Sequence, residues 1–165
     1  MLLRNLRLLI AAAALLLVST CSTAGTGHAA VTTLWPAYHL DPSRSGNDPN
    51  EPPFGNPAEA WTSPTLDGEV YAEPLVDGSS VIVVTENDSV YALDAATGHV
   101  QWGPVSLGTP RTSNFPCGDI NPLGITGTPV LDGGSLYVLA EVQLSQSSFA
   151  FHLAKLDPSN GSVAY

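Results

Sequence analysis

The chain has 165 residues, and its fifteen Asp and Glu against five Lys and Arg give a net charge of −10 at pH 7. This length is enough for one ordinary domain. Proteins that bind nucleic acid need clustered Lys and Arg to displace the counterions of the phosphates. Because the basic residues are so few, and only three of them follow residue 30, we exclude nucleic acid as a partner.

The first thirty residues have the order of a secretory leader. Met1–Arg7 carries two positive charges, Leu8–Val18 is an uncharged apolar run of 11 residues, and small residues follow as far as Ala30. This order is typical of a signal peptide and predicts export to the periplasm or to the outside of the cell. A helix of 11 residues rises about 16 Å, roughly half of a bilayer core, so a membrane span would require a longer and less apolar segment.

Two ways of processing this leader stay open. Gly27-His28-Ala29 fits the small-x-small pattern of a soluble exported protein. Leu17–Cys21 resembles a lipoprotein box, in which Cys21 would be acylated and would anchor the chain to a membrane, although Thr20 departs from that pattern. Cys117 is the single cysteine after residue 30, which predicts a free thiol or a partner elsewhere.

After residue 30, short runs rich in Val, Leu, Ile and Tyr alternate with Gly and Pro. This spacing is typical of many short strands joined by tight turns. We expect an N-terminal segment with a closing strand over residues 31–68, followed by a regular pattern of strands and turns over residues 69–165. The first four strands of that pattern are predicted at residues 70–76, 80–85, 89–94 and 100–105.

Residues 73–86 repeat at residues 128–141, where Pro, Asp, Gly and Glu match at a constant offset of 55. A second block, residues 91–102, matches residues 153–165 at an offset of 63 with one slip near Ala154. The change of offset places eight extra residues around Val142 to Phe151, between two strands of the second copy. A longer hairpin there costs little closure entropy. Each copy is therefore predicted to form four antiparallel strands.

The run Val81–Val84 is apolar at every position. Such a strand is buried on both faces of its sheet, so other sheets must cover it. Stacked four-stranded sheets provide that cover.

The segment Ala92–Trp102, ALDAATGHVQW, resembles the A-x-D-x-x-T-G-x-x-x-W repeat of the pyrroloquinoline-quinone (PQQ) β-propeller family. Trp35–Gly46 resembles the usual N-terminal stretch of that family, and Trp61 looks like the end of the strand that closes its ring. The resemblance implies an all-β fold, a partial β-propeller of four-stranded antiparallel blades, with about two blades and part of a third. The repeat positions that it marks as structural are Asp94, Gly98, Trp102, Asp157, Gly161 and Tyr165.

The second copy is degenerate, with Asn160 in place of Thr and Tyr165 in place of Trp. In the family the closing aromatic docks between neighbouring blades, which implies a structural role for Trp102. A propeller closes with about 4–8 blades. Two repeats therefore predict a truncated product or a fragment of a longer precursor, with an uncovered blade face that lowers its stability.

One loop could carry chemistry. In Cys117–Pro129, Asp119 and Asn121 could place oxygens around a calcium ion, and the glycines allow close approach of the backbone. The resemblance implies PQQ and calcium as cofactors of the enzymes in this family, many of which have adjacent cysteines near the quinone. Here Gly118 follows Cys117, so that feature is missing. The alternative interpretation is a connection between blades that positions the next strand.

Two other clusters have structural interpretations. Glu86-Asn87-Asp88 is predicted to be a polar hairpin turn, because Asn and Asp suit turns. His39, His99 and His152 lie at unrelated positions of the repeat and lack the spacing of metal ligands.

Two functions follow from these observations. The first is an exported binding or scaffolding module, similar to the non-catalytic relatives that hold partner proteins, and its partner would be a protein or a small molecule. The alternative is the N-terminal part of a PQQ- and calcium-dependent dehydrogenase that oxidises alcohols or sugars. The repeat motif alone supports this alternative, and the fragment itself is then expected to be inactive because a quinone site in the channel needs the whole ring.

Overall fold

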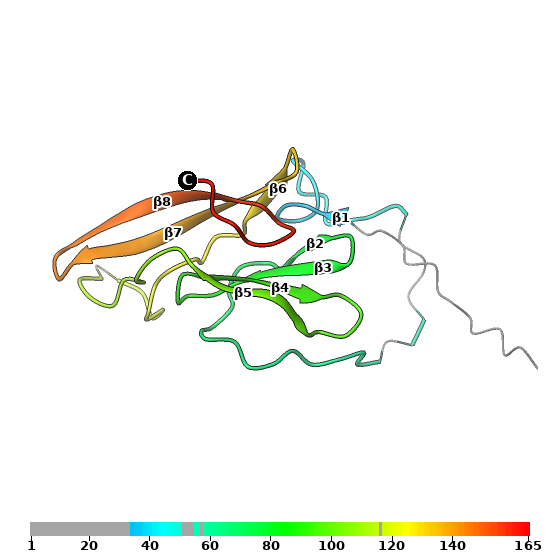
Figure 1. The fold of residues 1–165 in the computed structure, drawn as a ribbon, viewed down its shortest axis with the longest axis horizontal. Coiled ribbons are helices and arrows are strands. Elements are labelled where there is room, and N and C mark those ends of the chain that lie inside the picture. The colour runs from blue at the N-terminus through cyan, green and yellow to red at the C-terminus, as the bar shows by residue number, and fades with distance from the viewer. Residues whose placement is uncertain (1–33, 51–54, 57, 116) are drawn as a thin grey trace, which may run out of the picture. The chain divides into compact units, whose positions relative to one another are not determined.

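The computed structural model describes residues 34–50, 55–56, 58–115 and 117–165. These residues belong to the second of two compact units, Val31–Tyr165. The predicted leader, with Cys21 and both cleavage patterns, lies outside the described residues. Every helix or strand that the structure describes is a β-strand, which confirms the all-β prediction (Figure 1).

The strands form two antiparallel sheets, in which each strand pairs with the next one along the chain. The first sheet has the order β1-β2-β3-β4-β5, and the second has the order β6-β7-β8. The strands of the first sheet are β1 (Leu34–Trp35), β2 (Leu75–Asp77), β3 (Ser80–Val84), β4 (Ser89–Asp94) and β5 (Val100–Ser106). Those of the second are β6 (Val130–Asp132), β7 (Ser135–Ser145) and β8 (Ser148–Leu156).

The burial of the strands follows their sequence pattern. Ile82, Val83 and Val84 of β3 are at most 6 % exposed, which confirms that this apolar run is covered on both faces. In β7, Leu136 and Val138 are fully buried while Leu139 is 51 % exposed. Because successive side chains of a strand point to opposite faces, β7 belongs to a sheet with one covered face.

The extra residues of the second copy lengthen its hairpin, as the change of offset predicts. β7 and β8 have 11 and 9 residues, whereas the equivalent β3 and β4 have 5 and 6. Their pairing runs from Leu136 and Leu156 to Ser145 and Ser148 at the tip. The insertion therefore extends a sheet instead of forming a separate loop.

Three details correct the sequence prediction. The strand predicted at residues 70–76 is confined to β2, because Pro74 has no N–H to donate and the amide of Glu73 donates to Thr128 Oγ1 at 3.0 Å. The second sheet has three strands instead of four, and a single bridge between Leu156 and Val163 marks where the fourth strand would pair. β1, which extends the first sheet beside β2, is an additional strand that the repeat pattern does not predict.

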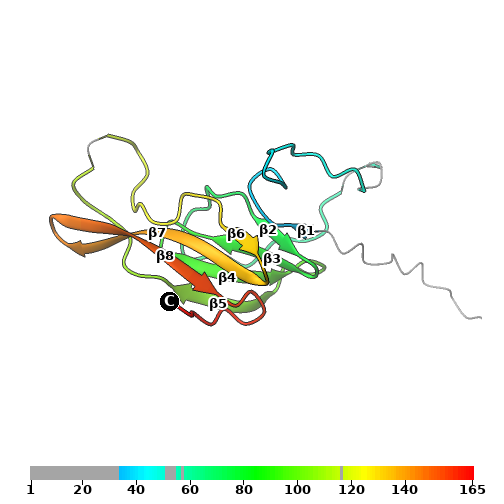
Figure 2. The ribbon, with the colours of Figure 1, turned by 90° about the horizontal axis from the view of Figure 1, so that it is seen from above.

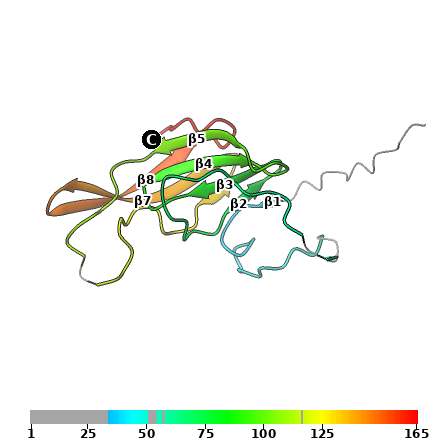
Figure 3. The ribbon, with the colours of Figure 1, turned by 90° about the horizontal axis from the view of Figure 1, so that it is seen from below.

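The main core lies between the two sheets. The first sheet contributes Leu75, Ile82, Val84 and Val90, and the second contributes residues such as Leu136. A smaller cluster on the other face of the first sheet contains Val83, Tyr91 and Leu93, with Leu66 packed against it. Figure 2 shows the second sheet lying over the first, and Figure 3, from the opposite side, shows the segment that leads to β2 crossing the first sheet.

The two repeats stack with equivalent faces turned the same way. Leu75, Val84 and Val90 of the first repeat are at most 1 % exposed and pack in the main core. Their equivalents at the offsets of 55 and 63 are Val130, Leu139 and Leu153, which are 42, 51 and 57 % exposed. The second sheet therefore presents to the outside the same face that the first sheet buries.

Candidate functional site

Two tryptophans cover glycines at the turns of the repeats. The indole Nε1–H of Trp102 donates to the Pro158 carbonyl at 3.0 Å, and a Cβ added to Gly161 would lie 2.6 Å from Cε3 of the same ring. Trp61 covers Gly98 in the same way, and its Nε1–H also donates to a backbone carbonyl at 2.9 Å. Both glycines have positive φ, +72° and +74°. Each turn thus receives the aromatic ring of the segment before it, and only glycine leaves room for that ring.

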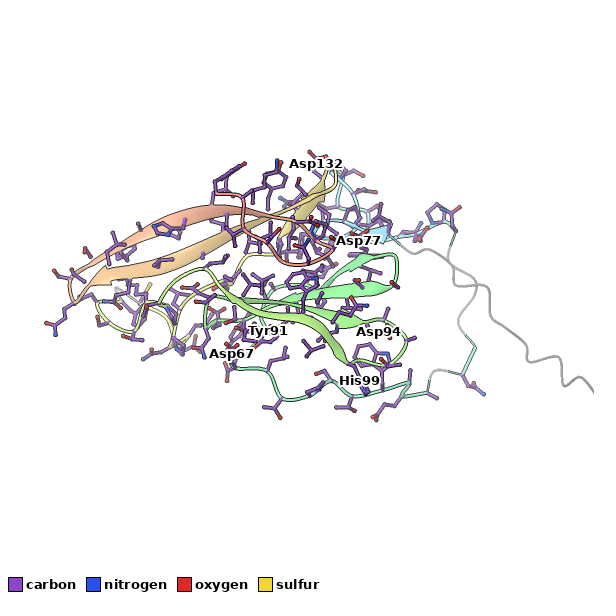
Figure 4. All side chains as sticks on the ribbon, in the orientation of Figure 1. Asp67, Asp77, Tyr91, Asp94, His99 and Asp132 are labelled. Carbon is purple, nitrogen blue, oxygen red and sulfur yellow. The ribbon has the colours of Figure 1, made fainter. Side chains whose placement is uncertain are left out.

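An aspartate begins each of these turns. Oδ1 of Asp94 accepts hydrogen bonds from the Ala96 amide at 3.0 Å and from the amide and hydroxyl of Thr97 at 2.9 and 2.8 Å. Asp157 accepts from the amide and hydroxyl of Ser159 at 2.8 and 2.7 Å. The hydroxyl donors are the main reason that the pKa of each carboxyl lies below its ordinary value. Figure 4 shows Asp94 and His99 at this turn of the first repeat.

The N-terminal segment lies along the first strands of both repeats. β1 pairs with β2, and the Pro36 carbonyl accepts from the Leu131 amide of β6 at 2.8 Å. The indole N–H of Trp35 donates to the carboxylate of Glu73, and the His39 amide donates to the same carboxylate at 3.3 Å. Because β2 and β6 belong to different sheets, this segment joins the two sheets along one edge.

The connection between the repeats, residues 107–129, is fixed to the β7–β8 hairpin by Arg111. Its Nη1 donates to Glu141 Oε1 at 2.7 Å, and its Nε donates to the Ser113 carbonyl at 3.0 Å. The guanidinium carbon lies 3.8 Å from the centroid of the Phe149 ring. Arg111 is only 6 % exposed, so this is a buried ion pair supported by hydrogen bonds and a cation–π contact.

The turn between β3 and β4 is held by the segment that precedes β2. The carboxylate of Asp67 accepts from the hydroxyls of Thr85 and Ser89 at 2.9 and 2.6 Å. Tyr91 of β4 lies beside Asp67 (Figure 4). Burial is the larger cause, and the charge of the Asp67 carboxylate the smaller one, that raises the pKa of Tyr91 above its ordinary value.

The same turn is bound from the other side by the connection between the repeats. Glu86 Oε2 accepts from the Gly124 amide at 2.8 Å and from the Thr126 hydroxyl at 3.1 Å. Glu86 and Asp88 are 1 % and 0 % exposed, so the polar turn that the sequence predicts is buried. Three carboxylate oxygens, Glu86 Oε1 and both of Asp88, have no hydrogen-bond partner among the described residues.

The residues that the sequence suggests for a cofactor lie at the surface. Asp119 and Asn121 are exposed, and Cys117 is an exposed free cysteine. In the described part of the chain, no group of three or more His, Cys, Asp or Glu is placed to hold a metal ion. The calcium hypothesis for Asp119 and Asn121 stays a prediction. The side chains of three histidines are exposed: His39, His99 and His152.

Sequence reasoning missed the contacts made by Glu73, Arg111 and Asp88. Their partners lie far away in the sequence, so neither spacing nor periodicity reveals them. One signal was present for the buried carboxylates. Glu86 and Glu141 occupy equivalent positions of the two repeats, and each directly follows a buried residue, Thr85 or Ala140.

A family model described as "Outer membrane protein assembly factor BamB" matches residues 57–164. The chain belongs to this family of PQQ-like repeat proteins. The match to the BamB family includes both tryptophan–glycine contacts and both sheets except β1. It confirms the resemblance to PQQ-repeat proteins and the prediction of a partial β-propeller.

Among solved structures, the crystal structure of BamB from Moraxella catarrhalis is 26 % identical to the chain, with a TM-score of 0.41. The match covers 61 % of this chain and 26 % of that protein, so the chain spans about a quarter of its relative's length. No curated protein matches the chain. The described residues include no helix long and apolar enough to cross a membrane.

Proposed function

We propose that the chain is part of an exported β-propeller that acts as a binding or scaffolding module in the cell envelope. The description of its family, a factor in the assembly of outer-membrane proteins, supports a role in holding other proteins. The leader-like residues 1–30 support export. The described residues offer contact surfaces, and their buried polar groups serve mainly to hold loops and turns together.

The observation that carries this proposal is the way in which the two repeats stack. Val130, Leu139 and Leu153 are exposed on the outer face of the second sheet, although their equivalents in the first repeat are buried against the next sheet. A further repeat of the same kind would cover them in the same manner. This supports a longer ring of blades, of which the present chain supplies two.

The segment around Tyr38 is the surface that we propose for partner binding. Tyr38 is 45 % exposed, its ring is stacked on His39 at a centroid distance of 4.0 Å, and the Arg44 guanidinium lies 5.8 Å from the Tyr38 centroid. Tyrosine and arginine are enriched among the residues that dominate binding energy in protein interfaces. Their stacking also reduces the side-chain entropy that would be lost on binding.

Site-specific photo-crosslinking in cells tests this role. A photoreactive residue in place of Tyr38 is expected to crosslink one reproducible envelope protein, and Arg44→Glu is expected to reduce that crosslink at least tenfold. The matched control is the same photoreactive residue in place of Val100, which is 40 % exposed on β5. Equal crosslinking from both positions, or none from Tyr38, would contradict the proposal.

Export is tested separately with a reporter enzyme that folds only outside the cytoplasm, fused after residue 50. We expect reporter activity that is lost when Leu15 is replaced by Arg, because a charge in the apolar run blocks recognition of a signal peptide. Metabolic labelling with a fatty acid, compared with a Cys21→Ala variant, distinguishes a lipid anchor from a soluble exported form.

The alternative function, a PQQ- and calcium-dependent dehydrogenase, is supported by the repeat motif alone. The test uses a purified protein whose sequence continues past Tyr165. PQQ and calcium are added to it, and dye reduction is measured with a panel of alcohols and sugars. Dye reduction that depends on an added substrate would contradict the scaffolding proposal and support the dehydrogenase. We expect none.

A further inference from the structure

Glu86 and Asp88 form a buried pair of carboxylates between the β3–β4 turn and the connection between the repeats. They are 1 % and 0 % exposed. Glu86 Oε2 has two donors, the Gly124 amide and the Thr126 hydroxyl, but Glu86 Oε1 and both oxygens of Asp88 have no partner among the described residues. Buried polar groups are normally hydrogen-bonded, so three unpaired carboxylate oxygens require an explanation.

Asp88 is packed closely against the connection between the repeats. A Cβ added to Gly124 would lie 2.6 Å from Asp88 Oδ1, so the carboxylate rests directly on that glycine. The Leu107 amide donates to the Asp88 carbonyl at 2.8 Å, and the Glu141 amide donates to the Gly124 carbonyl at 3.2 Å. Both the side chain and the backbone carbonyl of Asp88 therefore contact this connection.

The charged groups around Asp88 do not neutralise it. Glu86 on the same turn and Glu141 on β7 are both acidic, and their charges disfavour a negative charge on Asp88. Arg111, on the connection, donates to Glu141 at 2.7 Å. On the segment before β2, the Glu69 carboxylate accepts from the Tyr71 hydroxyl at 2.7 Å. No positive group on the described parts of these elements bonds to Asp88.

An ionised carboxylate without a partner is costly to bury, and such a group usually takes up a proton instead. A metal ion would be the other source of positive charge, but the described residues contain no group of three acidic, histidine or cysteine ligands placed to hold one. Within the pair, Glu86 has two hydrogen-bond donors and Asp88 has none among the described residues. The proton is therefore best placed on Asp88.

We propose that Asp88 is a buried proton-binding site that latches the connection between the repeats onto the β3–β4 turn, and that loss of this proton loosens the connection around Gly124. Burial, with the charges of Glu86 and Glu141, raises the pKa of Asp88 to about 7, which is consistent with this role. The inference is independent of the proposed function, because it concerns only groups within the two repeats.

The sign of the pH dependence follows from this raised pKa. Between its ordinary value of 3.8 and about 7, Asp88 loses its proton in the unfolded chain and keeps it in the folded chain. The unfolding equilibrium constant therefore rises about tenfold for each pH unit in this window and levels off above it. Ordinary paired carboxylates have the opposite effect and destabilise a protein as the pH falls.

The test compares the purified protein with its Asp88→Asn variant in urea unfolding at pH 4.5 to 7.5. Asparagine is neutral, has nearly the same shape, and tolerates the positive φ of 56° at this position. We expect the ratio of the two unfolding constants to change about a hundredfold from pH 4.5 to 7. Asp132→Asn changes an exposed carboxylate at the end of β6; it is the control and should keep the pH dependence of the parent protein. Parallel pH profiles for Asp88→Asn and the parent would overturn the proposal.

A second variant covers the case in which Asp88→Asn does not fold. Glu86→Gln keeps an oxygen that can accept from Gly124 and Thr126, but it removes the negative charge that faces Asp88. The pKa of Asp88 in the folded protein should then be lower, so the rise of the unfolding constant with pH should end at a lower pH than in the parent protein. An unchanged window would also overturn the proposal. If millimolar Ca²⁺ or Mg²⁺ at pH 7.5 stabilises the parent protein but neither variant, a cation occupies the site, and the assignment to a proton is wrong.

Tryptic cleavage tests the latch itself. At pH 7.5, cleavage after the buried Arg111 requires the connection to open, whereas the exposed Arg44 provides an internal standard. We expect the ratio of cleavage after Arg111 to cleavage after Arg44 to be at least tenfold lower in Asp88→Asn. Equal ratios would show that the proton does not control the connection.

Discussion

The contact between Trp102 and Gly161 can be tested by adding one methyl group. In Gly161→Ala the new Cβ would lie 2.6 Å from Trp102 Cε3 and 2.9 Å from Val105 Cγ2, at a φ of +74°. The left-handed conformation costs about 1–2 kcal/mol for a residue with a Cβ, and overpacking typically adds about 1–3 kcal/mol. We therefore expect the free energy of unfolding to fall by about 2–5 kcal/mol.

Gly133→Ala is the matched control for this prediction. Gly133 has a φ of +53°, and a Cβ there would meet no atom within 4 Å. Gly133→Ala should lower the free energy of unfolding only by the cost of the left-handed backbone conformation, about 1–2 kcal/mol. Urea unfolding followed by far-UV circular dichroism measures both variants without depending on tryptophan fluorescence.

A double-mutant cycle then isolates the aromatic contact. In a Trp102→Leu background, the contact with the indole ring is removed and the contact with Val105 Cγ2 remains, so Gly161→Ala should cost less than it does in the parent protein. Equal costs of the two glycine substitutions in the parent protein would refute the reasoning, because the ring would then not fill the space above Gly161.

The remaining predictions concern the polar contacts. Arg111→Ala leaves Glu141 buried without its partner, 2.7 Å away in the parent protein, and should lower the free energy of unfolding by about 3–5 kcal/mol in urea titrations, whereas Glu141→Gln with Arg111→Met should restore part of the loss. Asp94 and Asp157 have lowered pKa values, so their stabilisation is present above the ordinary pKa of 3.8 and is lost below it. Acid unfolding monitored below pH 4 should therefore be less steep in Asp94→Asn; an unchanged acid transition would show that the turn bonds are equally strong in the unfolded chain. Leu139→Lys with Leu153→Lys should reduce binding of an apolar dye without lowering the urea midpoint, and a loss of stability would mean that the outer face is already covered.

The strands of the two repeats could be predicted from the sequence because their burial is local. Alternation, Asp-Gly turns and the apolar run Val81–Val84 each indicate strands without reference to distant residues. The offset of 55 also predicted that Leu136 and Val138 would form a strand equivalent to β3. Which face of that strand is covered could not be predicted, because it depends on how the sheets stack.

The buried polar contacts could not be predicted for the same reason. The sequence pattern correctly placed Glu86-Asn87-Asp88 in a turn, but a turn on the surface and a turn covered by another loop have the same composition. Arg111 and Glu141 are 30 residues apart, and no local pattern links them. β1 was missed because its two residues become a strand only by pairing with β2.

Proton NMR of the two turn glycines tests most directly whether the repeats stack through their tryptophans. The Hα signals of Gly98 and Gly161 should be shifted upfield by the indole rings, with nuclear Overhauser contacts to Trp61 and Trp102 respectively. Trp102→Leu should abolish the shift at Gly161 and leave that at Gly98. Unshifted signals and no contacts to either ring would contradict the stacked arrangement of the two repeats.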